Sequence, residues 1–359
     1  MTFMTHFILI RIGESNMTKL YDYAVVIMRA QPFHNGHLAL IHRASGKAKN
    51  VIVLIGSVNS PRSIKNPFTY EERKHMIQFE SSASVRPLSD FKYNDQKWIA
   101  NVQKTVYDTI ISCEGDNCNN KSIALIGLNK DDSTRYLNWF PTWDFIETEP
   151  VDQQGLDATS IREILFSGKK NLSFIQGVVP QTVFDFIREV KGCDWWKMLE
   201  EEYSFIEKYK AAWATAPYPP IFVTVDSVVV QDGHVLLVKR GASPGKGLLA
   251  LPGGFINQNE RIQDAVIREL REETRIKVPE PVLRGSIVCS DVFDAVDRSL
   301  RGRTITHAFL IKLASTGSLP VVKGGDDAEK AFWVPISSLD ERTMFEDHFS
   351  VVQSMVDKI

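Results

Sequence analysis

The sequence contains little that marks a secreted, membrane-embedded or polyanion-binding protein. Only four cysteines occur in 359 residues, and their scatter favours reduced thiols in a cytoplasmic protein over a disulfide framework. Cys113 and Cys118 flank a short polar loop and would bind a metal only with further ligands. No apolar run is long enough to span a bilayer, so no membrane partner is expected. The formal net charge of −2 gives no indication of a nucleic-acid partner.

Length and composition predict two domains. A chain of 359 residues, 43% hydrophobic and 24% charged, is long for one domain and can bury two cores. The run APYPP at 216–220 cannot continue a helix and is interpreted as the domain boundary. The predicted organisation is an N-terminal extension at 1–17, a first domain at 18–192, a linker helix and proline-rich segment at 193–220, and a second domain at 221–359.

The two halves differ in their order of strands and helices. In the first half, buried-type strands alternate with helical patterns, which predicts an α/β fold with a doubly wound parallel sheet. Its strands are expected at 24–28, 51–55, 122–126 and 143–147, and its helices at 37–47, 70–79, 96–111, 159–166 and 181–190. The second half is expected to be an α+β domain, with strands at 222–230, 234–239, 282–289, 304–313 and 331–334 and a terminal helix from 347.

The most informative stretch of the second half is GFINQNERIQDAVIRELREETRI at 254–276. Its characteristic positions are Gly254, Glu260, Arg268, Glu269, Glu272 and Glu273. The last three lie three and four residues apart, so a helix would place their carboxylates on one face. Clustered carboxylates repel one another unless a cation lies among them, and Mg²⁺ prefers oxygen ligands. An ordinary charged helix face is the alternative interpretation.

This stretch resembles the Nudix box, the signature of enzymes that cut a diphosphate joined to another moiety. The resemblance implies that the three glutamates of the helix bind Mg²⁺, with Mn²⁺ as an alternative. It also implies that Arg268 orients these glutamates and that Glu260 supports the metal site. Arg275 stands where the family usually has glycine, and it is expected to change the turn that ends the helix rather than the chemistry.

Two longer stretches resemble the ADP-ribose pyrophosphatase branch of that family, LPGGFINQNE at 251–260 and VFDAVDRSLRGRTITHAF at 292–309. The resemblance implies hydrolysis of ADP-ribose to AMP and ribose 5-phosphate. The run DDAE at 326–329 is a candidate source of the general base, and a loop carboxylate without a role is the equal alternative. Another nucleoside diphosphate derivative is the alternative substrate.

In the first half, His34-Asn35-Gly36-His37 lies between the first expected strand and the first expected helix. Doubly wound sheets bind ligands at the carboxyl ends of such strands, and the start of a helix favours phosphate. Gly36 would let the backbone approach a phosphate, and histidines three residues apart can point the same way. A pair of helix-capping histidines is the alternative interpretation.

The tetrad resembles the HxGH motif of the nucleotidyltransferase superfamily, and DATSIR at 157–162 resembles its second motif. MRAQPFHNGHL at 28–38 is similar to the archaeal-type nicotinamide mononucleotide (NMN) adenylyltransferases, as are the runs at 66–73 and 95–102. The resemblance implies that His34 and His37 act on the ATP phosphates and that Arg162 grips the β- and γ-phosphates. The further residues expected to bind ATP or NMN are Arg29, Gln31, Phe33, Gly36, Trp98, Thr159 and Ser160.

Several of these positions have more than one interpretation. Trp98 is expected to stack on the cationic nicotinamide ring, and a core position in its helix is the alternative. Thr159 or Ser160 is expected to cap the helix that carries Arg162. Lys130 and Arg135 either reach the site or lie in a solvated loop.

The order of the two halves resembles the bifunctional NMN adenylyltransferase/Nudix hydrolases of bacteria. The resemblance implies the substrates ATP, NMN and ADP-ribose, the product NAD, and a homo-oligomer. One alternative makes the second half an ADP-ribose sensor, although such domains usually lose the metal carboxylates that this chain keeps. Another alternative changes the first acceptor to pantetheine phosphate or FMN, against which the NPFT run and Trp98 argue.

Overall fold

The computed structural model describes residues 21–128, 132–149, 157–168, 171–325 and 328–359. The expected N-terminal extension at 1–17 lies outside the described residues. Within the described ranges, no helix combines the length and the apolar character that crossing a membrane requires. The four cysteines are all free thiols.

The first domain is built on a five-stranded sheet in which every strand pair is parallel. Its strands lie in the order β3-β2-β1-β4-β5 and are β1 (Tyr21–Met28), β2 (Ala48–Ile55), β3 (Ser84–Pro87), β4 (Ile123–Gly127) and β5 (Asp144–Glu147). The chain moves outward from β1 in one direction to β3 and then crosses to β4. The crevice at the carboxyl ends of β1 and β4 is therefore the switch point at which such sheets bind ligands.

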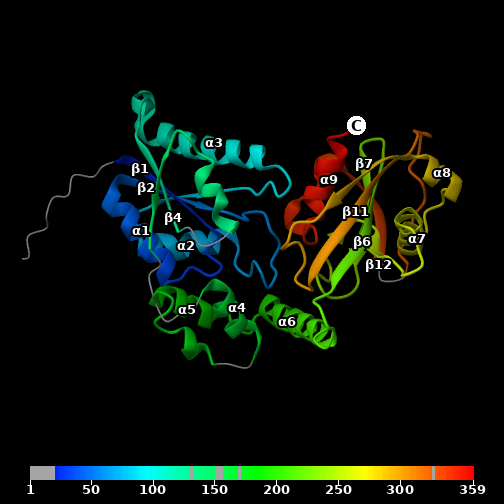
Figure 1. The fold of residues 1–359 in the computed structure, drawn as a ribbon, viewed down its shortest axis with the longest axis horizontal. Coiled ribbons are helices and arrows are strands. Elements are labelled where there is room, and N and C mark those ends of the chain that lie inside the picture. The colour runs from blue at the N-terminus through cyan, green and yellow to red at the C-terminus, as the bar shows by residue number, and fades with distance from the viewer. Residues whose placement is uncertain (1–20, 129–131, 150–156, 169–170, 326–327) are drawn as a thin grey trace, which may run out of the picture.

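Helices cover both faces of this sheet (Figure 1). One face packs against α1 (Asn35–Lys47), α2 (Tyr70–Glu80), α4 (Ala158–Phe166), α5 (Gln181–Val190) and α6 (Asp194–Ala212). The other face packs against α3 (Asp95–Glu114) and the 3-10 segment η2 (Asp132–Asn138). Strand residues alternate between the two cores, because successive side chains of a strand point to opposite faces. The expected doubly wound α/β fold is confirmed.

The second domain has a seven-stranded mixed sheet in the order β10-β11-β6-β7-β12, with β8 on β7 and β9 on β6. Its strands are β6 (Ile221–Gln231), β7 (His234–Arg240), β8 (Leu249–Ala250), β9 (Gly253–Phe255), β10 (Ile287–Phe293), β11 (Arg303–Lys312) and β12 (Ala328–Pro335). Val225 and Val229 of β6 pack toward α7 (Ile262–Thr274), whereas Val228 and Val230 pack toward α9 (His348–Val356). The expected α+β domain is confirmed.

One expected strand is partly wrong. Residues 282–289 were expected to be extended, but α8 occupies Glu280–Gly285 and β10 begins only at Ile287. Pro281 lies in the first turn of the helix, where its fixed φ is suitable and its missing N–H is not needed. Arg284 then pairs with Glu280 one turn earlier at 2.9 Å. These local interactions outweigh the apolar pair Val282 and Leu283, which suggested a strand.

The two domains meet beside α6 and α9 (Figure 1). Although α6 falls in the proposed linker at 193–220, its Trp196, Leu199 and Ile206 belong to the first domain's core. Its Glu202 accepts a hydrogen bond from the Gly245 N–H of the second domain at 2.9 Å. We therefore propose that the linker segment is a fixed part of the first domain that also contacts the second.

Candidate functional site

His34 and His37 form a capping box at the start of α1. The Nδ1 atom of His34 accepts a hydrogen bond from the Gly36 N–H at 3.1 Å, and the His34 N–H donates to Nδ1 of His37 at 3.3 Å. The two ring centroids lie 3.8 Å apart. A Cβ atom on Gly36 would lie 2.9 Å from the His34 ring, so a side chain there would disturb the cap. A neutral ring that accepts at Nδ1 carries its proton on Nε2, so the cap also fixes which edge of each ring can donate.

Arg162 extends from α4 toward the end of β1. Its Nη1 donates to the Gln31 carbonyl at 2.8 Å, and its Nη2 donates to Thr159 Oγ1 at 3.1 Å. Burial lowers the pKa of Arg162, and the charge of Asp157 opposes that shift. The expectation that Thr159 or Ser160 caps α4 is wrong. Asp157 is the N-cap residue, and its carboxylate accepts from the Ser160 N–H at 2.8 Å, the third helical position that a cap side chain reaches.

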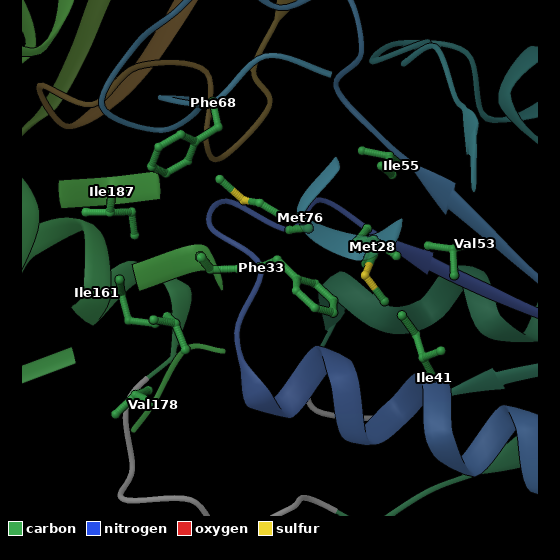
Figure 2. Packing of buried hydrophobic residues seen from close by; sticks show 14 of the residues in the cluster. Met28, Phe33, Ile41, Val53, Ile55, Phe68, Met76, Ile161, Val178 and Ile187 are labelled. Atoms are coloured by element: carbon green, nitrogen blue, oxygen red, sulfur yellow. The ribbon is translucent and has the colours of Figure 1, made fainter. Parts of the chain in front are cut away.

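Two residues that were expected to bind nucleotide lie in the interior. Phe33 is fully buried in the cluster that includes Met28 and Ile41 (Figure 2). The buried amide of Gln31 accepts from the Phe68 N–H at 3.0 Å and donates to the Phe68 carbonyl at 2.8 Å. Both side chains therefore hold the loop ahead of α1 in place, and their contact with nucleotide stays a prediction.

Arg73 has a positioning role that the sequence did not reveal. It is almost fully buried, and its Nη1 donates to the carbonyls of Arg29 and Gly56, both at 2.7 Å. Its Nη2 donates to the Ser57 carbonyl at 3.0 Å. The guanidinium thus joins the segments that leave β1 and β2. The only signal in the sequence was its place in the run at 66–73, which carried no individual role.

Arg29 and Trp98 line a cavity of about 550 Å³ beside the carboxyl ends of β1 and β2. The Trp98 ring meets Tyr136 edge-on, with the ring centroids 5.4 Å apart, and Trp139 at 6.2 Å. Trp98 therefore combines the two interpretations, because one part of its side chain packs in a core and another part faces a cavity. Arg135 also lines the cavity, whereas Lys130 lies outside the described residues.

The second candidate site is organised by Arg268 on α7. Its Nε and Nη2 donate to the two carboxylate oxygens of Glu260 at 2.7 and 2.8 Å. Its Nη1 donates to Glu269 at 2.7 Å and to Glu272 at 2.9 Å. Nη2 also donates to the Phe255 carbonyl at 3.3 Å. One guanidinium therefore joins the helix to the loop before it and to β9.

Glu273 and Glu269 face the glycine turn at β9. The Glu273 carboxylate accepts from the Gly253 N–H at 3.0 Å. A Cβ atom on Gly254 would lie 2.8 Å from the carboxyl carbon of Glu269, so the glycine allows the helix to approach the backbone. Burial raises the pKa of Glu273 to about 8, and the charge of Glu269 adds to the shift. Burial likewise raises the pKa of Glu269.

Across the described residues, no group of three or more His, Cys, Asp or Glu side chains is arranged to hold a metal ion. Glu272 is drawn to Arg268 with its side chain 45% exposed, while Glu273 lies at the turn. The donor chemistry still suits a divalent cation, because Glu269 and Glu273 offer carboxylate oxygens. The pKa of each is raised by burial and by neighbouring carboxylates, which a cation would offset.

Two further expectations concern the edges of this site. Arg275 ends α7 in the left-handed conformation, with φ 45°, as expected for a position that is usually glycine. Of the run at 326–329, residues 326–327 lie outside the described ranges. Glu329 pairs with Lys239 at 3.0 Å.

Comparisons with known proteins agree with this division. Residues 29–121 match the cytidylyltransferase-like family and residues 221–355 match the NUDIX domain. A nicotinamide/nicotinic acid mononucleotide adenylyltransferase of Acinetobacter baylyi is 35% identical over 188 residues, 51% of this chain and 94% of the relative. An ADP-ribose pyrophosphatase of Methanocaldococcus jannaschii is 34% identical over 131 residues, 36% of this chain and 70% of the relative.

A solved structure spans both halves. The crystal structure of a bifunctional NMN adenylyltransferase/ADP ribose pyrophosphatase of Francisella tularensis, complexed with AMP and Mn ion, is 35% identical with a TM-score of 0.85. The match covers 94% of this chain and 99% of that one. The chain belongs to the family of bifunctional NMN adenylyltransferase/ADP-ribose pyrophosphatases.

Proposed function

We propose that the first domain transfers the adenylyl group of ATP to NMN. The 5′-phosphate of NMN attacks the α-phosphorus of ATP, the bond to the β-phosphate breaks, and NAD and pyrophosphate form. The observation that carries this proposal is the placement of a capped histidine pair and Arg162 around the end of β1, next to a cavity lined by Arg29 and Trp98. Phosphate is already ionised at neutral pH, so the protein has to position the reactants and offset charge.

Different residues of the first site bind different parts of ATP and NMN. The Nε2–H groups of His34 and His37 donate to ATP phosphate oxygens and to the charge that develops in the transition state. Arg162 binds the β- and γ-phosphates, and its bonds to Gln31 and Thr159 hold its guanidinium in place. Arg29 adds positive charge, and Trp98 offers an aromatic face to the nicotinamide ring.

The second domain hydrolyses ADP-ribose to AMP and ribose 5-phosphate. Water attacks one phosphorus of the diphosphate, the bridging P–O bond breaks, and a proton leaves the attacking water. A bound divalent cation supplies Lewis-acid polarisation of the phosphates and activation of water. Glu269, Glu272 and Glu273 are the proposed ligands. Arg268 orients the first two, and Glu260 anchors Arg268.

The finer properties of the enzyme are part of the same proposal. Mg²⁺ is the proposed cation, because carboxylate oxygens are hard ligands that it prefers. NAD chemistry and free thiols support a cytoplasmic location. A homo-oligomer is proposed from the family resemblance alone, and sedimentation of the purified chain tests it.

Two variants separate the activities. His37→Ala is expected to lower NAD formation from NMN and ATP by about 100-fold or more, since it removes a donor to the reacting phosphates. Glu273→Gln is expected to lower ADP-ribose hydrolysis by a similar factor, since it removes a metal ligand. Each variant should leave the other activity within about twofold.

The matched controls make the same substitutions at residues that have no proposed role in either reaction. His42→Ala changes an exposed histidine on α1, and Glu280→Gln changes an acid on α8. Both should retain both activities. A wild-type enzyme that forms no NAD, or that binds ADP-ribose without cleaving it in Mg²⁺, would refute the corresponding half of the proposal.

A further inference from the structure

The cavity beside Trp98 is walled by both domains. Its first-domain wall includes Arg29, Lys65 and Lys92, and its second-domain wall includes Asp297 and Leu300. Figure 1 shows loops of the first domain reaching toward the second domain on this side. A pocket that we assign to the acceptor of the first reaction is therefore completed by residues about 200 positions further along the chain.

Asp297 is one residue of the second domain that contacts the first-domain wall. Its carboxylate forms an ion pair with the Lys65 ammonium group, and Lys92 Nζ lies 3.5 Å from its Oδ1. Lys65 Nζ also lies 3.5 Å from the Asp297 carbonyl oxygen. One acid of the second domain thus contacts two lysines of the first.

The charge of Lys65 depends on the nearby Asp297 carboxylate. Burial lowers the pKa of Lys65, and the positive charge of Arg29 lowers it further, while Asp297 opposes both effects. Burial alone would raise the pKa of Asp297, but Lys92, Lys65 and Arg29 hold it well below its usual range. Without this carboxylate, the repulsion that Arg29 and Lys92 exert on Lys65 would no longer be opposed by Asp297.

The segment that carries Asp297 is firmly placed. The next residue, Arg298, is buried and donates to both oxygens of Asp347 at 3.0 Å. Tyr93 of the first domain also donates to Asp347, and its ring meets Phe293 edge-on with the centroids 4.8 Å apart. A buried ion pair of this kind fixes geometry because each partner would otherwise be left with an unpaired charge.

We propose that Asp297 is a positioning residue of the adenylyltransferase site, supplied by the hydrolase domain, that holds Lys65 and Lys92 where they bind the phosphate of the acceptor mononucleotide. This inference rests on the proposed function of the first domain. It makes affinity for the acceptor a property of both domains, whereas the adenylyl-transfer step remains a property of the histidine pair and Arg162.

The test is steady-state NAD formation by the full-length Asp297→Asn variant, with NMN varied at saturating ATP. The KM for NMN should rise about fivefold, the effect of losing one partly exposed ion pair. The kcat value and ADP-ribose hydrolysis should each change by less than about twofold. Asp297→Glu, which keeps the charge, should restore most of the affinity.

A matched control removes a different ion pair between the domains. Lys97 pairs with Asp357 at 2.9 Å on the exposed surface, and neither residue lines the cavity. Asp357→Asn should leave the KM for NMN unchanged. If it raises the KM as much as Asp297→Asn does, general loosening of the domains explains the effect and the proposal fails.

A second variant keeps the proposal testable if Asp297→Asn folds poorly. Lys65→Met should raise the KM for NMN by a similar factor, and the Lys65→Met/Asp297→Asn double variant should be little worse than Lys65→Met alone, because both act through one contact. An unchanged KM in both single variants, with an active wild type, overturns this inference only. A wild type without NAD formation overturns the proposed function instead.

Discussion

In the first domain, Arg162 and Arg73 donate to neutral groups, whereas in the second domain Arg268 donates to three carboxylates. Arg162 is held by the Gln31 carbonyl and the Thr159 hydroxyl, and Arg73 by four backbone carbonyls. A cation bound to neutral oxygens keeps its charge, so it can attract phosphate. Arg268 is neutralised by its partners, so its contribution is to arrange them.

The comparison separates two ways of binding a charged substrate. A nucleotide phosphate meets fixed positive charge directly in the first domain, while a diphosphate in the second domain meets carboxylates and needs a cation between them. Both kinds of charge also occur in one cavity, where the Asp297 carboxylate of the second domain contacts the Lys65 ammonium group of the first.

The largest expected effect tests whether Arg73 holds the first site by its bonds to neutral backbone groups. Arg73→Met should lower the free energy of unfolding by about 3 kcal/mol, because it leaves buried carbonyls without donors. Urea unfolding measures the change, and NAD formation should fall with it. Arg188→Met, on the exposed face of α5, should change stability by less than about 0.5 kcal/mol. A small effect of Arg73→Met would show that backbone anchoring is unimportant there.

The next largest effect is expected for Arg268→Gln, which tests whether Arg268 acts by orienting the carboxylates around it. Arg268→Gln should reduce ADP-ribose hydrolysis by about 10- to 100-fold, the usual effect of losing a residue that orients metal ligands. NAD formation should not change. Arg271→Gln removes an arginine of the same helix that pairs with Glu280 and with none of the proposed metal ligands, and it should retain full hydrolysis. Equal losses in the two variants would contradict the role given to Arg268.

A smaller effect concerns Arg275, an arginine of the second domain outside the charge network of Arg268. Because a non-glycine residue in the left-handed conformation is strained, Arg275→Gly should raise the free energy of unfolding by about 1 kcal/mol. Arg271→Gly, inside the helix, should lower it by about the same amount. Thermal and urea unfolding compare the two variants, and a loss in both would show that the Arg275 side chain makes stabilising contacts.

The smallest expected effect at neutral pH is that of His348→Gln on stability, and it compares a buried histidine with the two that cap a helix. His34 and His37 cap a helix, whereas His348 is buried and its Nδ1 accepts from the Leu251 N–H at 2.9 Å. Burial lowers the pKa of His348 below its ordinary value of 6.5. The unfolded chain then binds the proton more readily, so the stabilisation is complete above pH 6.5 and is lost as the pH falls below it. His348→Gln should flatten the fall in stability between pH 7 and 5, and an unchanged slope would contradict this assignment.

Much of the fold followed from local patterns. The buried strands and the helices of the first domain were expected within a few residues of their bounds, because apolar runs and period-3.6 patterns are local signals. The short strands β3, β8 and β9 were not expected, since two to four residues carry too little pattern. Residues 282–289 were misjudged because Pro281 and the Glu280–Arg284 pair, rather than apolar content, decide that segment.

The sequence revealed site residues only where the spacing between residues of one type indicates a shared function. The glutamate spacing on α7 and the histidine tetrad were visible, because a helix fixes which side chains share a face. The burial of Phe33 and Gln31 was not expected, because burial depends on what packs over a loop. The cap by Asp157 and the carbonyl bonds of Arg73 likewise depend on distances that one sequence does not contain.

By itself, the sequence determined the two domains, their fold classes and the two charged motifs, since each rests on residues near one another in the chain. Only the tertiary structure decided which charges meet. Arg298 pairs with Asp347, 49 residues further along the chain, and Asp297 of one domain contacts Lys65 of the other. Such pairs form because folding brings together groups from distant segments, and Coulomb energy depends on their separation in space and not along the chain.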